Sequence, residues 1–220
     1  MIRNGMGSKT KTLFALVKNL PIFDFGDIAT AEKNRTYLAI FASRYAKSGR
    51  FIRLKKEFYT TKEYIDKIQK NGFFNSYLEF LANVLYQPSY LSLEYILSQH
   101  NLITELAANF TSVTANKTKH FSNDLGGFFY HKIRKDLFRG FEITKEGNFT
   151  ILKATKSKAL FDFLYLRKNV LVDEKAVEEL RLNLSNLTAG DMRELKKHVN
   201  LEGSKKMTGI LDLLTRLWKQ

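Results

Sequence analysis

The fold of the first seventy residues is decided by a stretch that reads NRTYLAIFASRYAKSGRFIRLKKEFYT, from Asn34 to Thr60. Its first half has the period of a helix and its second half the period of a strand, with Gly49 between them. Because glycine readily adopts the conformation that ends a helix, we expect a helix over 34–48 that stops at Gly49. The alternation after Gly49 and the turn-like Lys55-Lys56-Glu57 predict a small β-hairpin that returns through Phe58-Tyr59-Thr60.

The predicted helix has two chemically different faces. At 100° per residue, an apolar stripe forms from Tyr37, Leu38, Phe41 and Tyr45. The opposite face is small, polar and cationic, and consists of Thr36, Ala39, Ile40, Ser43 and Lys47, with Arg35 and Arg44 on its flanks. A helix that packs on a core while it enters a DNA major groove, about 12 Å wide, needs this division.

Two shorter helices are expected before this one. Lys11 to Leu20 carries apolar residues at helical spacing, and Pro21 ends the segment. Asp27 is placed to cap a one-turn helix through Thr30 or Ala31. Helix, helix, helix and basic ribbon is the order of a winged helix-turn-helix, and we therefore predict a DNA-binding domain of this kind over residues 1–71.

The charge distribution supports a polyanionic partner. The formal net charge is +14, and residues 1–70 hold 15 Lys and Arg against six Asp and Glu. A basic stretch without any acid contains Lys33, Arg35, Arg44, Lys47, Arg50, Arg53, Lys55 and Lys56. Such a concentration favours DNA, RNA or an anionic membrane surface as the partner, and the alternative is a merely solvated surface.

Residues 72–220 are expected to form a mixed α+β domain, separated from the first by Asn71-Gly72. Helices are predicted near 75–87, 92–100 (capped by Ser92), from Thr155 or Ser157 onward, and near 174–184, 189–199 and 205–219. Short aromatic and β-branched runs predict strands at 110–114, 119–121, 127–133, 138–143 and 148–152. The expected architecture is a mainly antiparallel sheet covered by helices.

The composition bears on compartment and cofactors. The 220 residues contain no cysteine, which excludes disulfides, thiolate zinc sites and cysteine nucleophiles together. The absence of cysteine suits a reducing cytosol. In addition, no apolar run approaches the roughly 20 residues that are needed to cross a bilayer. We therefore expect a cytoplasmic protein without a membrane partner, a metal or a cofactor. The basic start, Met1 to Lys11, is expected to be a frayed arm rather than a signal peptide.

Residues that could carry catalysis are scattered. The four histidines are far apart in the sequence, and Gly7-Ser8 lacks the acidic pair of a nucleotidyltransferase. Glu142 with Lys145 and Asp124 would be the candidates for a nuclease-like site with a metal ion, and solvated loops are the simpler interpretation. Asp162 is expected on a polar helix face. The apolar stripe that ends in Leu217-Trp218 is expected to dock on the protein's own core, with a partner-binding surface as the alternative.

The order of several short motifs resembles the AbiEi family of antitoxins. The motifs are Gln87-Pro-Ser-Tyr-Leu-Ser-Leu-Glu-Tyr-Ile-Leu97, Asn101-Leu-Ile103, Thr111-Ser-Val-Thr114, Phe128-Phe-Tyr130, Leu137-Phe-Arg-Gly140 and Lys153-Ala-Thr-Lys-Ser-Lys-Ala-Leu-Phe-Asp-Phe-Leu-Tyr-Leu166. The resemblance covers about residues 10–170. The chain departs from the family at Lys156-Ser157, where the family usually has Pro-Glu before Lys-Ala-Leu.

This resemblance implies an antitoxin of an abortive-infection, type IV toxin–antitoxin system. It implies an N-terminal winged helix-turn-helix, repression of the protein's own operon through inverted repeats in the promoter, and a neighbouring nucleotidyltransferase-like toxin that the protein counteracts. The hypothesis that we derive from it is an antitoxin with no enzymatic activity of its own. Direct contact with the toxin and indirect action on it both stay open.

The leading hypothesis is a sequence-specific repressor that binds double-stranded DNA. Thr36, Ser43, Lys47 and Ile40 are expected to face base edges. The residues expected to hold phosphates or to enter the adjacent minor groove are Arg35, Arg44, Arg50, Arg53, Lys55 and Lys56, and Lys33 is a further DNA-binding candidate. Two alternatives come from other classes: a nucleic-acid-processing enzyme, either a nuclease or a nucleotidyltransferase, with a basic DNA-binding arm, and an interaction module for an acidic protein.

Overall fold

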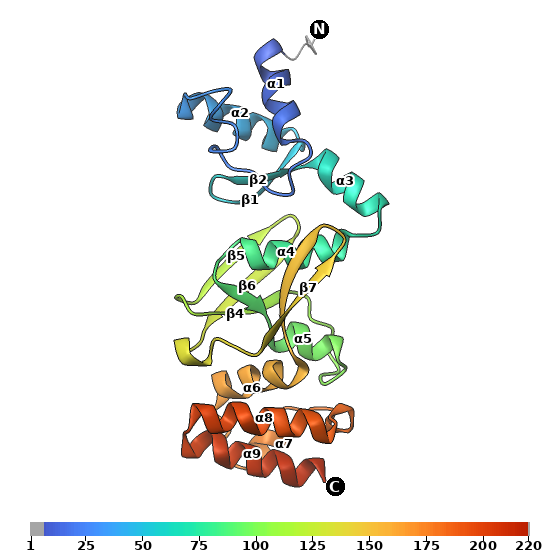
Figure 1. Cartoon of the computed structure of the whole chain (residues 1–220), viewed down its shortest axis with the longest axis vertical. Coiled ribbons are helices and arrows are strands. Elements are labelled where there is room, and N and C mark those ends of the chain that lie inside the picture. Colours follow the sequence, from blue (N-terminus) through green and yellow to red (C-terminus); the bar gives the residue numbers. More distant parts are fainter. Residues whose placement is uncertain (1–6, 220) are drawn as a thin grey trace. The chain divides into compact units, whose positions relative to one another are not determined.

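The computed structural model of the protein describes residues 7–219, and it divides into two compact units (Figure 1). The first unit contains the chain up to Leu78 together with Phe121–Gly126, and the second contains Glu79–His120 and Gly127 onward. The predicted domain boundary at residues 71–72 falls just before this division. Met1–Met6, most of the predicted basic arm, lie outside the described residues.

The first unit is built around two helices and a hairpin that the sequence predicted. Its elements are α1 (Ser8–Val17), α2 (Arg35–Lys47), β1 (Phe51–Lys55), β2 (Phe58–Thr61) and α3 (Lys62–Lys70). Strands β1 and β2 pair antiparallel, with Phe51 opposite Thr61 and Lys55 opposite Phe58. The predictions of a helix over 34–48 and of a hairpin after Gly49 are confirmed. The helix expected over Lys11–Leu20 exists, shifted toward the N-terminus.

The short helix expected after Asp27 is not formed. Residues 25–31 make consecutive turns instead, in which the Ala29 amide donates to the Gly26 carbonyl and the Ala31 amide donates to the Ile28 carbonyl. The Asp24 carboxylate accepts from the Gly26 amide at 2.6 Å, and the Asp27 carboxylate accepts from the Asp24 amide at 2.7 Å. These short-range side-chain bonds hold the chain in turns and compete with a regular helix.

The strand β1 also departs from the expected alternation. Phe51 and Leu54 are both buried although they are three residues apart, and Arg53 between them is exposed. The cause is an irregularity in the pairing, because the register shifts between Arg53 and Lys55. An extra residue in one strand lets side chains three apart point to the same side.

The elements after α3 are mixed α and β and belong mainly to the second unit, although α4 begins in the first unit and β5 ends in it. In order they are α4 (Phe74–Val84), β3 (Ser89–Leu91), α5 (Leu93–Gln99), β4 (Phe110–Thr114), β5 (Lys119–Asn123), β6 (Gly126–Lys132), the 3-10 turn η1 (Lys135–Leu137), β7 (Phe141–Glu146), β8 (Phe149–Ala154), α6 (Lys156–Arg167), α7 (Glu174–Glu178), the 3-10 turn η2 (Leu184–Asn186), α8 (Ala189–Glu202) and α9 (Lys205–Trp218). The helix predicted over 174–184 is reduced to α7 and η2.

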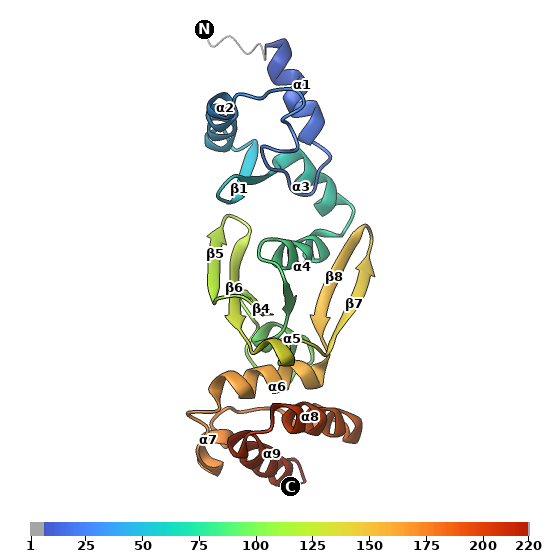
Figure 2. The ribbon, with the colours of Figure 1, turned by 60° about the vertical axis from the view of Figure 1, so that its left-hand side comes forward.

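The large sheet has six strands in the order β5-β6-β4-β3-β8-β7 (Figure 2). The pairs β3–β4 and β7–β8 are antiparallel, whereas β3–β8 and β4–β6 are parallel. The sheet is therefore mixed: the antiparallel pairs agree with the prediction, and the two parallel pairs were not expected. Strand β3, of only three residues, was not predicted, and it lies between β4 and β8 in the sheet.

The C-terminal helices α6, α7, α8 and α9 form a layer beyond one end of this sheet (Figures 1 and 2). In both ribbon views α6 lies between the strands and the pair α8 and α9 (Figures 1 and 2). The stripe Met207, Ile210, Leu211 and Leu214 of α9 is buried, which confirms that this helix docks on its own core. Among residues 7–219 no helix combines the length and the apolar character that crossing a membrane requires.

Candidate nucleic-acid interface

Both ends of α2 are fixed by local hydrogen bonds. At the start, the Asn34 side chain accepts from the Tyr37 amide at 3.1 Å. At the end, Gly49 has φ of 72°, and the amides of Gly49 and Arg50 donate to the carbonyls of Ala46 and Tyr45, each at 3.0 Å. This is the Schellman pattern, which places glycine just past a helix end. The helix therefore has a defined length and a defined set of outward positions.

The inner face of α2 packs against the core, and this packing fixes the orientation of the helix about its own axis. Leu38, Phe41, Ala42 and Tyr45 are buried, and Phe51 of the hairpin packs against this face. The ring centroid of Phe51 lies 5.5 Å from that of Phe41 and 5.3 Å from that of Tyr45. Aromatic contacts of this kind contribute about 0.5–1.5 kcal/mol each beyond the area that they bury. The apolar stripe predicted from the sequence is the one that packs, with Tyr37 half-buried at its edge.

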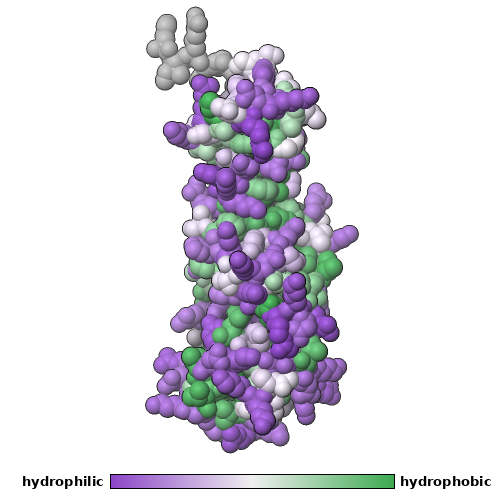
Figure 3. All heavy atoms as spheres, turned by 90° about the vertical axis from the view of Figure 1, so that its left-hand side faces the viewer, coloured by the Kyte–Doolittle hydropathy of each residue, from purple (hydrophilic) through white to green (hydrophobic). Residues whose placement is uncertain are grey.

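The outward face of α2 consists of Thr36, Ile40, Ser43 and Lys47. These four residues recur at helical spacing and all are exposed, with Ile40 at 63%. Arg44 is also exposed, beside them. Figure 3 faces the side of Figure 1 on which α2 lies, and hydrophilic side chains cover much of this unit there. The face is small, polar and cationic, as a helix that enters a groove of DNA requires.

The cations of the hairpin and of the residues just before it differ in whether they are exposed or lie against aromatic rings. Lys33, Arg53 and Lys56 are exposed. In contrast, the Lys55 ammonium lies over the Phe58 ring at 4.0 Å and 5.9 Å from the Phe121 ring, and the Arg50 guanidinium lies 5.8 Å from the Tyr45 ring. Arg53 and Lys56 are thus better placed than Lys55 to bind phosphate.

The acids that flank the basic stretch are each paired with a cation. The Glu32 carboxylate accepts from the Lys9 ammonium, and this bond lowers the pKa of Glu32 below its ordinary value. The Glu57 carboxylate lies 3.5 Å from the Arg35 guanidinium. Within residues 7–219, by contrast, no carboxylate lies within ion-pair distance of Arg44, Lys47, Arg53 or Lys56. The outward face of α2 and the hairpin therefore keep uncompensated positive charge.

A contact that the sequence analysis missed holds the hairpin from the other side. The side-chain amide of Asn123, in the Phe121–Gly126 segment of the first unit, donates to the Leu54 carbonyl at 2.9 Å. The Asn123 side-chain oxygen accepts from the Leu125 amide at 2.8 Å, which fixes the side chain. The bond satisfies a carbonyl at the irregular point of β1. No short-range pattern could predict it, because the two residues lie 69 positions apart.

The residues considered for catalysis are not assembled into a site. Glu142 and Lys145 are both exposed on β7, and their odd spacing places them on opposite faces of the strand. Asp124 belongs to the other unit. Across the described part of the chain, no group of three or more His, Asp or Glu side chains could hold a metal ion.

The least expected feature is a buried charge cluster on α6. The Lys158 ammonium lies 2.6 Å from the Asp162 carboxylate, and neither side chain is exposed. Asp162 also accepts from the Tyr90 hydroxyl at 3.0 Å and from the Ser92 hydroxyl at 2.8 Å. The expectation of a polar face for Asp162 was wrong, and Ser92, expected to cap α5, bonds this carboxylate instead. The four-residue spacing of Lys158 and Asp162 was the available signal.

Burial shapes the electrostatics of this cluster. It lowers the pKa of the Lys158 ammonium and raises that of the Asp162 carboxyl, because it penalises both charged forms. Their mutual attraction and the two hydroxyl donors oppose this effect. A cluster with no exposed surface offers no entry for a substrate, so its role in this conformation is to join α6 to the strand β3.

No family model matches the sequence, and no curated protein matches it.

Proposed function

We propose that the chain binds double-stranded DNA through the outward face of α2 and the hairpin β1–β2. The observation that carries the proposal is a cationic helix face whose opposite side is locked into a core. Thr36, Ser43 and Lys47 would contact base edges, and Arg44, Arg53 and Lys56 would hold phosphates. We further propose that the first unit works as a winged helix-turn-helix in which the turns over residues 25–31 replace the middle helix.

Our proposal for the biological role rests on the resemblance to AbiEi antitoxins. We propose that the DNA site is an inverted repeat in the protein's own promoter, and that the protein represses its operon and counteracts a nucleotidyltransferase-like toxin. Expression of the adjacent open reading frame alone and together with this chain tests that role. Growth arrest that the chain relieves is expected, and a neighbour that is harmless alone would remove the antitoxin part.

Charge reversal with a matched control tests the DNA interface. In the face variant, Arg44, Lys47 and Arg53 become Glu, and in the control variant Lys18, Lys67 and Lys70, which are exposed elsewhere in the same unit, become Glu. Both variants change the net charge equally. Fluorescence anisotropy with a labelled upstream duplex should show that the face variant binds at least about a hundredfold more weakly, and that the control variant loses far less.

Salt dependence separates phosphate contacts from base contacts. Lys56→Ala should weaken binding to the upstream duplex and to a scrambled duplex alike, and it should reduce the slope of log K against log salt by about 1. Ser43→Ala should reduce the preference for the upstream duplex and leave that slope unchanged. Equal losses in the face and control variants, or unchanged binding in the face variant, would refute the interface.

A further inference from the structure

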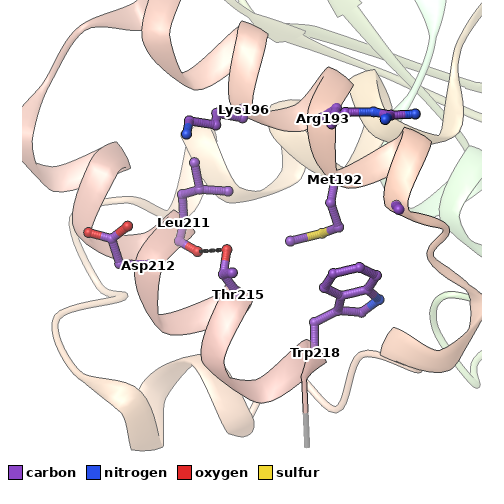
Figure 4. A pocket seen from close by; sticks show the side chains of 8 residues that line it. Met192, Arg193, Lys196, Leu211, Asp212, Thr215 and Trp218 are labelled. Atoms are coloured by element: carbon purple, nitrogen blue, oxygen red, sulfur yellow. Dashed lines mark hydrogen bonds between the residues drawn. The ribbon is translucent and has the colours of Figure 1, made fainter.

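The helix pair α8 and α9 leaves a groove of about 350 Å³ in the second unit (Figure 4). Its apolar part is formed by Met192, Leu211 and Trp218, and Figure 4 shows the Met192 side chain directed toward the indole ring. Arg193 and Lys196 of α8 form one rim. The groove thus combines an apolar floor with a cationic wall, the composition of sites that receive an amphipathic segment.

The polar atoms on the floor are already satisfied by the chain itself. The Trp218 Nε1–H donates to the Leu187 carbonyl at 3.1 Å, and the Thr215 hydroxyl donates to the Leu211 carbonyl at 2.7 Å. The first bond fixes the indole plane. Met192 and Leu211 are already buried, whereas Trp218 is half-buried, so a ligand on this floor gains mainly by covering the indole ring.

The wall is cationic because the acidic side chains of α8 are paired with groups on and near α6. Asp191 pairs with Lys156 at 2.7 Å, Glu202 pairs with Lys168 at 2.7 Å, and Glu194 accepts from the Thr155 hydroxyl at 2.7 Å. All three carboxylates are therefore engaged with α6 and its surroundings.

The basic residues on the outer side of α8 have no such partner. Arg193, Lys196 and Lys197 have no carboxylate within ion-pair distance in the part of the chain that the structure describes. The acids of the helix are engaged on its inner side, and its outer side is positive.

We propose that this groove binds an acidic amphipathic helix of a partner protein. Apolar side chains of that helix would cover Trp218, and its carboxylates would pair with Arg193 and Lys196. Nucleic acid fits less well, because a phosphate backbone could pair with the same two cations but would leave the apolar floor uncovered. The proposal concerns the second unit alone and is independent of the DNA interface.

Intrinsic fluorescence offers a direct test, since Trp218 is the one tryptophan in the sequence. The full chain is titrated with a panel of labelled helical peptides of about 16 residues that carry Leu, Phe or Met at helical spacing and Glu beside them. The control peptides have Lys in place of Glu. We expect the acidic peptides to raise the anisotropy of the label and to change the Trp218 emission, and the basic peptides to do neither.

Two charge-matched variants locate the binding site. The double variant Arg193→Glu, Lys196→Glu should weaken peptide binding by at least about tenfold. The double variant Lys117→Glu, Lys205→Glu changes the net charge equally on exposed residues of the second unit outside the groove lining, and should leave binding within about twofold. Each variant is also assayed for DNA binding, so that a failure here is distinguishable from a failure of the proposed DNA interface.

Three results would overturn the proposal. They are the absence of binding by every acidic peptide in the panel, equal losses in the two double variants, and displacement of a bound peptide from the groove by duplex DNA with a change in Trp218 emission. The last result would assign the groove to nucleic acid.

Discussion

Breaking the buried pair of α6 one partner at a time should cost far more than removing both charges. Lys158→Met keeps the length of the side chain without its charge, and Asp162→Asn keeps an oxygen that can accept from Tyr90 and Ser92. Each single substitution leaves one charge without a partner in a place with no exposed surface. The double variant leaves none.

The expected magnitude follows from the cost of neutralising the remaining group. Discharging a lysine of ordinary pKa at pH 7 costs about 5 kcal/mol, and protonating an ordinary aspartate costs about 4 kcal/mol. These figures agree with the roughly 3–5 kcal/mol by which half of a buried ion pair destabilises a protein. Removing both charges should cost only about 1–3 kcal/mol for the lost hydrogen bond and packing. The coupling free energy in a double-mutant cycle should therefore exceed about 3 kcal/mol.

Urea unfolding at pH 7 measures this coupling, with Trp218 emission reporting on the second unit. The matched control is the exposed pair Lys62 and Asp66, which has the same four-residue spacing and the same 2.6 Å distance. With Lys62→Met and Asp66→Asn, followed by circular dichroism, the coupling should stay below about 0.5 kcal/mol. A coupling below about 1 kcal/mol for the buried pair, or a double variant less stable than either single variant, would refute the reasoning.

Two further predictions concern the second unit. Gly140 has φ of 77°, and a Cβ there would lie 2.7 Å from His198. Gly140→Ala should therefore lower the free energy of unfolding, measured by thermal denaturation, by about 1–3 kcal/mol. Gly209→Ala, in α9 with open space around it, should raise it by about 0.5–1 kcal/mol, and a loss at both positions would contradict the argument. Burial alone would raise the pKa of Glu202, but the Lys168 ammonium and further hydrogen bonds hold that pKa below its ordinary value. The resulting stabilisation is present above the unfolded-state pKa near 4.5 and is lost as the pH falls through the folded-state pKa. Between pH 7 and 3, the free energy of unfolding measured with denaturant should therefore fall less for Glu202→Gln than for the parent chain. Superimposable curves of this free energy against pH would count against the role of Glu202.

Features with a local cause could be predicted from the sequence. Asn34 and Gly49 mark both ends of α2, because capping and the left-handed glycine conformation depend on a few neighbouring residues. The apolar stripe of α2 and the turn of the hairpin are local in the same sense. The candidate DNA-binding residues on α2 could thus be placed on one face before the structure was known.

Features that depend on distant partners could not be predicted. Strand β3 has only three residues, and it becomes a strand because β4 and β8 pair with it from both sides. Asp162 is charged and so was expected at the surface, yet its partners Tyr90 and Ser92 lie about seventy positions earlier. The contact of Lys55 with Phe121 has the same kind of cause, since Phe121 comes from a later part of the chain. In each case tertiary packing overrides the local preference.

The bond from Asn123 to the Leu54 carbonyl has a consequence for synthesis on the ribosome. The first unit lacks Phe121–Gly126 until about 50 residues beyond Leu78 have been added, which takes roughly 2–10 s at ordinary elongation rates. During that time water must satisfy the Leu54 carbonyl. The first unit is therefore completed only after part of the second unit has been translated. A fragment cut at residue 71 would lack Asn123 and with it the bond to the Leu54 carbonyl.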